Sequence, residues 1–423
     1  MQTRSRTAPF EAPAKRFATA LSAAVREHPA TGVAFPGRFG TNVVSAAELE
    51  ERALRVAAGL RALGVTPGAV VAVQLPAGPE NMIAQVAALL SGAVLLPLDP
   101  ACRERELLRR LRRFDVAALF TPAGRAHSVL GSRALPGVLP ELRQVIAVTS
   151  PWEASWIPAD ALDWAVLEAF RPLAEAVPAQ PDDVCLVVGP KGVRHTHRGL
   201  LTELEALQGL RYGRPVSGAH LDLLPPGRPG AVYALLRALV YGVPTVVPER
   251  RDPEALLALI GRHRVTTAAG DSTQLAAVLD AAERAGQETG LCEFLAHGTM
   301  LPAALVRRAE RSGVAAFRSF GLPEHPTVAS GSWADPLHKR TGTAGRAVPG
   351  TQIRIVDNAG NILPAEQPGE IQSRGPGRFA GYAGRTRETA ALAADGWLRT
   401  GGTGLLDGDG FLVVTSQTFP PAR

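Results

Sequence analysis

Cysteine is scarce in this sequence. The chain of 423 residues holds three cysteines, Cys102, Cys185 and Cys292, which lie far apart. An odd number at such spacing excludes a disulfide framework and the paired-cysteine signature of a zinc site. A reducing compartment suits such a chain, so we expect a cytoplasmic protein.

Aromatic residues are also few, and neither sign of charge dominates. Phe, Trp and Tyr make up 5% of the residues, and the net charge is +6. The arginines are scattered except between Arg103 and Phe114, where Leu107, Leu111 and Phe114 recur at helical spacing. This pattern is typical of a solvated helix face, so we predict no nucleic-acid partner.

Long apolar runs are absent as well. No run reaches the ~18 residues that a membrane span needs, and the N-terminal stretch lacks the continuous apolar core of a signal peptide. We therefore expect no membrane span. The segment "FATALSAAVREH", from Phe17 to His28, is amphipathic and predicts a first helix.

The sequence does contain an alternation of short apolar runs with helical patterns. Ser45 and Glu48 have the spacing of a capping box, and an apolar stripe follows from Leu49 to Leu63. The strand-like "AVVAVQL", a helical segment and "AVLLPLD" come next. This βαβ rhythm indicates parallel sheets that are covered by helices.

From about Thr341 the pattern changes to alternating strands separated by Asn-Ala-Gly-Asn and Asp-Gly-Asp-Gly turns, which indicates antiparallel hairpins. We therefore predict an α/β fold with two βαβ-type subdomains, residues 1–180 and 181–340, each with a mainly parallel sheet. A distorted β-barrel subdomain, residues 341–415, follows with a strand at Gln352–Val356. Residues 416–423 are expected to form a truncated hinge or tail.

Four segments, taken in order, carry a resemblance to a known family. They are the stretch from "LRALGVTPG" to "AVLLPLDP", then "GVRHTHRGLL", "FGLPE" and the long stretch that begins "GRAVPGTQIRIVDNAGNILP". Together they resemble the large N-terminal domain of the adenylate-forming (AMP-dependent synthetase) superfamily, which includes acyl- and aryl-CoA ligases. The resemblance implies that a carboxylate and ATP form an acyl-adenylate, whose acyl group then passes to CoA or a carrier thiol. It also implies ATP, magnesium and CoA as cofactors, and a small C-terminal domain with the adenylation lysine that is absent from this sequence.

The nucleotide motifs depart from the family pattern, first in the phosphate loop. The family has a Ser-, Thr- and Gly-rich loop before Pro-Lys-Gly, whereas Val188 here runs straight into Gly189-Pro190-Lys191-Gly192. We predict a tight turn at Gly189–Gly192 without convergent N–H groups, and Lys191 as a remnant of the site. Losing two or three hydrogen bonds to charged groups, at ~1.5–3 kcal/mol each, corresponds to about a thousandfold or more in ATP affinity.

Other positions also match the family only in part. Phe320, Gly321 and Glu324 match a Tyr-Gly-x-Thr-Glu block, in which Glu324 would bind magnesium only if ATP binds. Thr400 belongs to an Arg-Thr-Gly-Asp motif whose Asp, the residue implied to bind the ribose, is Gly402 here. The loss of these contacts predicts that ATP binding is weak or lost.

Some residues match the implied acyl pocket instead. Arg228 takes the position of a family histidine, and His297 and Gly298 take the positions of twin glycines. Arg228 could pair with a ligand carboxylate. His195 and His197 suggest a metal site, but no third ligand is evident and we expect them to be surface residues.

Three functions stay open at this point. The first is a fold repurposed to bind or transform an acyl or aryl compound without adenylation, in secondary metabolism. The second is a non-catalytic partner of a related biosynthetic enzyme or of a carrier protein. The third is an AMP-forming acid ligase that a C-terminal domain completes in trans. No catalytic residue is evident, and we predict that adenylation by the isolated chain is absent or very weak.

Overall fold

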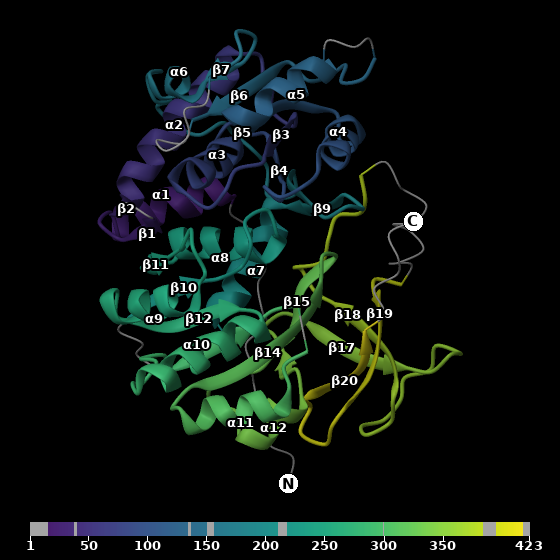
Figure 1. The fold of residues 1–423 in the computed structure, drawn as a ribbon. Coiled ribbons are helices and arrows are strands. Elements are labelled where there is room, and N and C mark those ends of the chain that lie inside the picture. The colour runs from purple at the N-terminus through teal and green to yellow at the C-terminus, as the bar shows by residue number, and fades with distance from the viewer. Residues whose placement is uncertain are drawn as a thin grey trace.

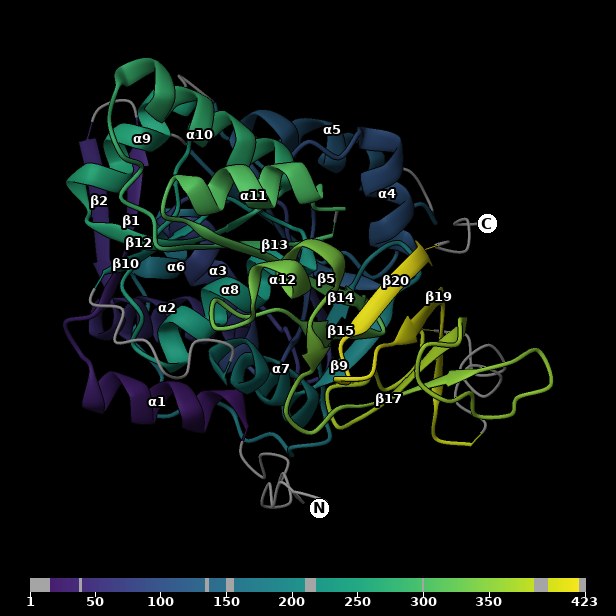
Figure 2. The same ribbon diagram turned by 90° about the horizontal axis from the view of Figure 1, so that it is seen from below.

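The computed structural model describes residues 16–37, 40–133, 137–149, 156–209, 218–298, 300–383 and 395–417. In these ranges the chain forms three β-sheets, and helices pack around the two larger ones (Figure 1, Figure 2). The expected α/β fold is confirmed. Within the same ranges, no helix is both long and apolar enough to cross a membrane.

The first sheet has seven strands in the order β7-β6-β5-β3-β4-β8-β9. Its neighbours pair in parallel except for β9, which runs antiparallel to β8. The strands are β3 (Val70–Val73), β4 (Val94–Pro97), β5 (Val116–Pro122), β6 (Gln144–Val148), β7 (Leu162–Asp163), β8 (Val184–Val188) and β9 (Val193–Thr196). The alternation of β3, β4 and β5 with helices is the predicted βαβ arrangement.

The second sheet has nine strands in the order β16-β15-β14-β13-β12-β10-β11-β1-β2. Its middle strands, from β14 to β1, pair in parallel, and antiparallel strands complete both edges. The strands are β1 (Gly32–Gly37), β2 (Gly40–Ser45), β10 (Ala219–Asp222), β11 (Thr245–Val246), β12 (Val265–Gly270), β13 (Glu293–Ala296), β14 (Ala315–Leu322), β15 (His325–Ser330) and β16 (Arg346–Ala347).

Neither of the two large sheets is formed by one continuous part of the chain. The N-terminal hairpin β1–β2 joins the second sheet, where Val33 lies opposite Thr245. The hairpin β8–β9 joins the first sheet, where Leu186 lies opposite Leu95. The pattern change near residue 180 therefore precedes a hairpin that still belongs to the first sheet. The division of the chain into subdomains stays a prediction.

The third sheet is antiparallel, as the hairpin turns indicated. Its order is β17-β18-β19-β20, and the predicted strand at Gln352–Val356 is β17. The other strands are β18 (Gly369–Arg374), β19 (Leu398–Leu406) and β20 (Leu412–Gln417). Ile355, Ile371 and Leu412 of this sheet share a buried cluster with Phe320 of β14, which fixes the third sheet against the second.

Helices connect most of these strands. They are α1 (Phe17–Glu27), α2 (Ala46–Ala62), α3 (Pro79–Leu90), α4 (Glu104–Arg113), α5 (Ala123–Arg133), α6 (Trp164–Glu168), α7 (His197–Gly209), α8 (Pro229–Val240), α9 (Pro253–Arg262), α10 (Ser272–Ala285), α11 (Ala303–Arg311) and α12 (Leu337–Gly342). The predicted first helix is α1. In α2, the Ser45 hydroxyl accepts from the Glu48 N–H, so one half of the expected capping box is formed.

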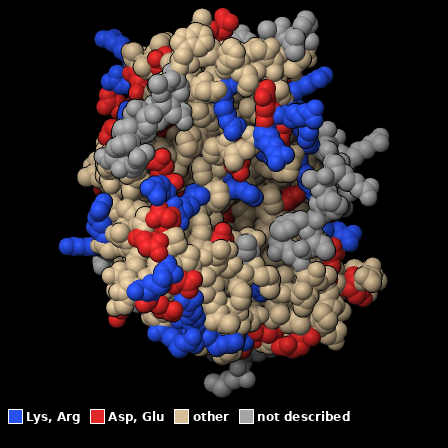
Figure 3. Space-filling model, viewed as in Figure 1, with Lys and Arg blue, Asp and Glu red and all other residues tan. Residues whose placement is uncertain are grey.

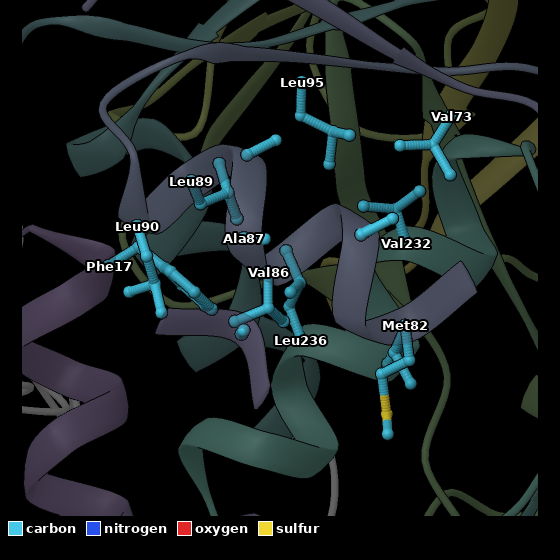
Figure 4. Close-up of a cluster of buried hydrophobic side chains, with 14 of the residues drawn as sticks. Phe17, Val73, Met82, Val86, Ala87, Leu89, Leu90, Leu95, Val232 and Leu236 are labelled. Carbon is cyan, nitrogen blue, oxygen red and sulfur yellow. The ribbon is translucent and has the colours of Figure 1, made fainter. Parts of the chain in front are cut away.

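The largest core lies where helices of both parts of the chain meet. Phe17, Val86 and Leu90 come from α1 and α3, and Val232 and Leu236 come from α8 (Figure 4). All five are buried, and full burial of such a side chain contributes about 1.5–3 kcal/mol. One face of α8 is thereby held in the core, which leaves another face for the second sheet.

Candidate functional site

A cavity of about 570 Å³ lies beside α8, at the carboxyl ends of β10, β12 and β13. Ligands of open α/β sheets bind at this end of parallel strands. A space-filling view shows a hollow near the middle of one face, with side chains of both charges around it (Figure 3). The cavity brings together five residues that the sequence singled out: Arg228, His297, Gly298, Phe320 and Gly321.

Arg228 is the residue before the first turn of α8, and its side chain is exposed at the rim of the cavity. The sequence positions it by a tight loop, since Gly227 has a φ of +81° and passes against the Leu98 carbonyl, where a Cβ would overlap. The guanidinium therefore offers positive charge at the entrance.

His297 follows β13 and is held by its backbone N–H, which donates to the Gly270 carbonyl at 2.8 Å. Burial, with a smaller contribution from the positive charge of Arg237, lowers the pKa of its imidazole to about 4. The ring is therefore neutral at pH 7. Its Nδ1 lies 3.4 Å from Ser319 Oγ, so it presents a neutral hydrogen-bonding group to the cavity.

Phe320 is buried on β14, and its ring forms part of the cavity wall. A Cβ placed at Gly402 would lie 3.4 Å from Phe320 Cζ. The position that the resemblance assigns to the ribose carboxylate is therefore next to the ring of Phe320, which takes the place of the tyrosine in the family's Tyr-Gly-x-Thr-Glu block. The backbone brings the two positions together, although Gly402 has no side chain to bind a ribose.

Lys191 lies elsewhere, in the turn between β8 and β9. Val188 pairs with Val193, and Gly189 and Gly192 both have positive φ. The Gly192 N–H donates to the Gly189 carbonyl at 3.3 Å. The predicted tight turn is confirmed.

Arg113 of α4 holds this turn from outside. Its guanidinium donates to the Pro190 carbonyl at 2.7 Å and to the Lys191 carbonyl at 3.3 Å. The ring of Phe114 occupies the space in which a Cβ on Gly192 would stand. The turn is therefore fastened to the end of α4.

Glu324 is buried and does not line the described part of the cavity. Its Oε1 accepts from the Tyr382 hydroxyl at 2.5 Å, and its backbone carbonyl accepts from the Phe379 N–H at 2.8 Å. Magnesium prefers six oxygen ligands, many of them from water and substrate phosphates. Among the described residues no group of three or more His, Cys, Asp or Glu could hold a metal ion. Glu324 as a magnesium ligand in the presence of ATP therefore stays a prediction.

The Thr400 hydroxyl takes part in hydrogen bonds within the third sheet. It donates to the Ile371 carbonyl at 2.7 Å and accepts from the Gly402 N–H at 3.1 Å. Thr400 is not among the described residues that line the cavity. The structure thus separates the matched residues into two sets, with Lys191, Glu324 and Thr400 outside the cavity.

The expected surface position of His195 and His197 is wrong, because both are buried. His195 Nε2 lies 2.8 Å from the Pro323 carbonyl, and burial lowers the pKa of each imidazole to about 4. His197 is also the first residue of α7, so the two residues do not share one strand. They are packing residues between the first sheet, α7 and the segment before β15.

The sequence reasoning missed a set of polar residues at the inner wall of the cavity. They are Glu203, His220, Tyr233, Arg237, Thr267 and Glu293, all of which are buried. A signal was present for Arg237, a charged residue within the apolar helix sequence "PGAVYALLRALV". For the strand residues the signal is weaker, since their neighbours come from distant segments.

The buried carboxyl group of Glu203 makes the stability of the fold depend on pH. Burial raises the pKa of its carboxyl from 4.5 to about 7, although the Thr327 hydroxyl and N–H, which donate to it at 2.5 and 3.2 Å, act in the opposite direction. The pKa of this carboxyl group is higher in the folded state than in the unfolded state, so the folded state binds the proton more tightly. The resulting contribution to the free energy of unfolding is fully present below pH 4.5 and is lost as the pH rises through about 7.

We expect Glu203→Gln to remove this decrease in the free energy of unfolding at higher pH. Between about pH 5 and pH 8 the free energy of unfolding of the unmodified chain should fall by about 3 kcal/mol more than that of the variant. Urea titrations at the two pH values measure the difference. Glu51→Gln, on the exposed face of α2, should leave the pH dependence unchanged. Parallel pH profiles for the unmodified chain and Glu203→Gln would contradict the assignment.

Residues 21–383 match the family model described as AMP-binding enzyme. The chain therefore belongs to the AMP-binding enzyme family, and the resemblance read from its motifs is confirmed at this level.

Relatives agree with this membership. The chain is 28% identical over 387 residues to a medium-chain fatty-acid–CoA ligase of Escherichia coli, which covers 87% of this chain and 67% of the relative. It is 30% identical over 374 residues to a sulfoacetate–CoA ligase of Cupriavidus necator, which covers 84% and 69%. The N-terminal domain of FACL13 from Mycobacterium tuberculosis has the same fold, with a TM-score of 0.83 at 23% identity over 95% of this chain and 100% of that one.

Proposed function

We propose that this chain binds an acyl or aryl carboxylic acid in the cavity beside α8 and does not adenylate it. The observation that supports the proposal is a contrast between two neighbouring parts of the structure. The cavity has a volume of about 570 Å³, whereas the β8–β9 connection beside the expected phosphate site is the four-residue turn Gly189–Gly192.

The turn offers little to a triphosphate. Pro190 has no N–H, and the Gly192 N–H donates within the turn to Gly189. Convergent backbone N–H groups are what a phosphate loop supplies to its anion. Because the Arg113 guanidinium also fastens two of the turn's carbonyls, the backbone is held in its present form.

The cavity does offer contacts for a carboxylic acid. Its rim carries the exposed Arg228, whose planar guanidinium can bind a carboxylate through two hydrogen bonds. Its walls include Ala269, Leu295 and Phe317, which suit an acyl chain or an aryl ring. Neutral His297 adds a hydrogen-bonding group without a competing charge.

Isothermal titration tests the proposal directly. We expect a panel of fatty and aryl acids to include ligands that bind in the absence of ATP, while ATP with magnesium gives no measurable heat at the same concentrations. Arg228→Met should weaken acid binding about tenfold, the effect of one charge-assisted contact. Arg171→Met, at an exposed arginine outside the cavity, should leave acid binding unchanged.

Tight binding of ATP would contradict the proposal and favour the acid ligase. Failure of every acid to bind would contradict it as well.

A further inference from the structure

The floor of the cavity is a row of polar side chains on three neighbouring strands. His220 of β10 lies opposite Thr267 of β12, and Thr267 lies opposite Glu293 of β13. Direct neighbours in parallel strands point to the same face of a sheet, and His220 Nδ1 is 3.0 Å from Thr267 Oγ1. Each of the three residues is at most 3% exposed, and each lines the cavity.

This composition is unusual for the middle of a parallel sheet. Strands that are covered on both faces are normally apolar, because burying a polar group without a hydrogen bond is costly. The next row toward the rim follows that rule, since Ala269, Leu295 and Phe317 are direct neighbours on β12, β13 and β14. The cavity therefore has an apolar wall between a charged rim and a polar floor.

Helix α8 extends the polar floor from the other side. Gly230, Tyr233, Ala234 and Arg237 line the cavity at the i, i+3, i+4 and i+7 spacing of one helix face. The opposite face, with Val232 and Leu236, is fixed in the core (Figure 4). Arg237 is seven positions after Gly230, so at 1.5 Å per residue the cavity side of α8 is about 10 Å long.

Arg237 stands at the deep end of this face and is 3% exposed. Its Nη1 donates to Gln208 Oε1 at 3.2 Å. Arg237 is itself among the residues that line the cavity. The guanidinium of Arg237 from α8 and the carboxyl group of Glu293 from β13 thus both border the inner end of the cavity.

From this arrangement, and on the basis of the proposed function, we infer that the cavity selects carboxylic acids that carry a hydroxyl group at the end remote from the carboxylate. A hydroxyl is neutral and can accept from the Arg237 guanidinium while it donates to the Glu293 carboxylate. A second carboxylate would face Glu293, and an ammonium group would face Arg237. An alkyl end would displace water from these polar groups without replacing its hydrogen bonds.

The test compares acids that differ only in that hydroxyl. Titrations without ATP use 4-hydroxycinnamate against cinnamate and 8-hydroxyoctanoate against octanoate. We expect the hydroxylated member of each pair that binds to bind at least about tenfold more tightly. Arg237→Met should reduce this ratio to about twofold or less. Arg340→Met, at an equally buried arginine that pairs with Glu310 away from the cavity, should keep the ratio.

Each outcome decides between the two proposals. Equal affinity within the pairs would overturn the hydroxyl selectivity and leave acid binding intact. Absence of binding by these four acids while other acids of the panel bind would overturn the selectivity alone, and absence of binding by the whole panel would overturn the proposed function as well. The ratio for the unmodified chain decides the question even if thermal unfolding shows that Arg237→Met is not folded.

Discussion

When ATP, magnesium and fatty or aryl acids are supplied together, we expect pyrophosphate release by this chain not to exceed the background rate measured without the protein. In the turn Gly189–Gly192, Pro190 has no N–H and the Gly192 N–H donates to the Gly189 carbonyl. We therefore expect two or three hydrogen bonds to the phosphates to be lost, which corresponds to about a thousandfold in ATP affinity. Gly402 removes a further contact, to a different part of the nucleotide, so the two losses should add to a first approximation. A coupled pyrophosphate assay measures the rate.

Gly402→Asp serves as the internal comparison. A Cβ at this position would be in ordinary contact with Phe320, Ser416 and Thr400, each at 3.4 Å, so the variant should fold. It should nevertheless gain little activity, because it restores one contact while the phosphate end remains unbound. A robust, acid-dependent signal from the unmodified chain would contradict the proposed function and favour a ligase.

A second large effect is expected at Gly345, where the second and third sheets meet. Gly345 has a φ of +82°, and a Cβ there would overlap the Ser330 carbonyl. Its carbonyl accepts from the Leu412 N–H at 2.7 Å, and its N–H donates to Thr343 Oγ1 at 3.1 Å. The backbone is thus held on both sides and cannot shift to make room.

Gly345→Ala should therefore lower the free energy of unfolding by at least about 3 kcal/mol, from backbone strain and overlap together. Gly360→Ala is the matched control, because Gly360 has a similar φ of +87° but no atom within 4 Å of its added Cβ. It should lose only about 1–2 kcal/mol, from the conformation alone. Urea unfolding of both variants measures the difference, and equal losses would show that the overlap is relieved.

Local patterns predicted those features that depend on local sequence. The stripe of α2 is buried at Leu49, Val56 and Leu60, as its helical spacing indicated. The strand at Gln352–Val356 and the turn at Gly189–Gly192 were predictable in the same way, since turn residues and alternation specify them within a few positions.

The floor of the cavity could not be predicted in this way. Thr267 and Glu293 are neighbours only because β12 and β13 pair in one particular register after a crossover through α10. The burial of His195 has a similar cause, because its partner is the carbonyl of Pro323, which is distant in sequence. Such contacts arise from strand order, and one sequence by itself does not specify strand order.

The two faces of α8 have a consequence for how the protein can evolve or be redesigned. Val232, Leu236 and Leu239 belong to the core, whereas Gly230, Ala234 and Arg237 border the cavity. Substitutions at the first set lower the stability of the fold, whereas those at the second set change the shape and charge presented to a ligand. A combinatorial library confined to positions 230, 234 and 237 would therefore explore new ligand preferences without replacing the core residues of this helix.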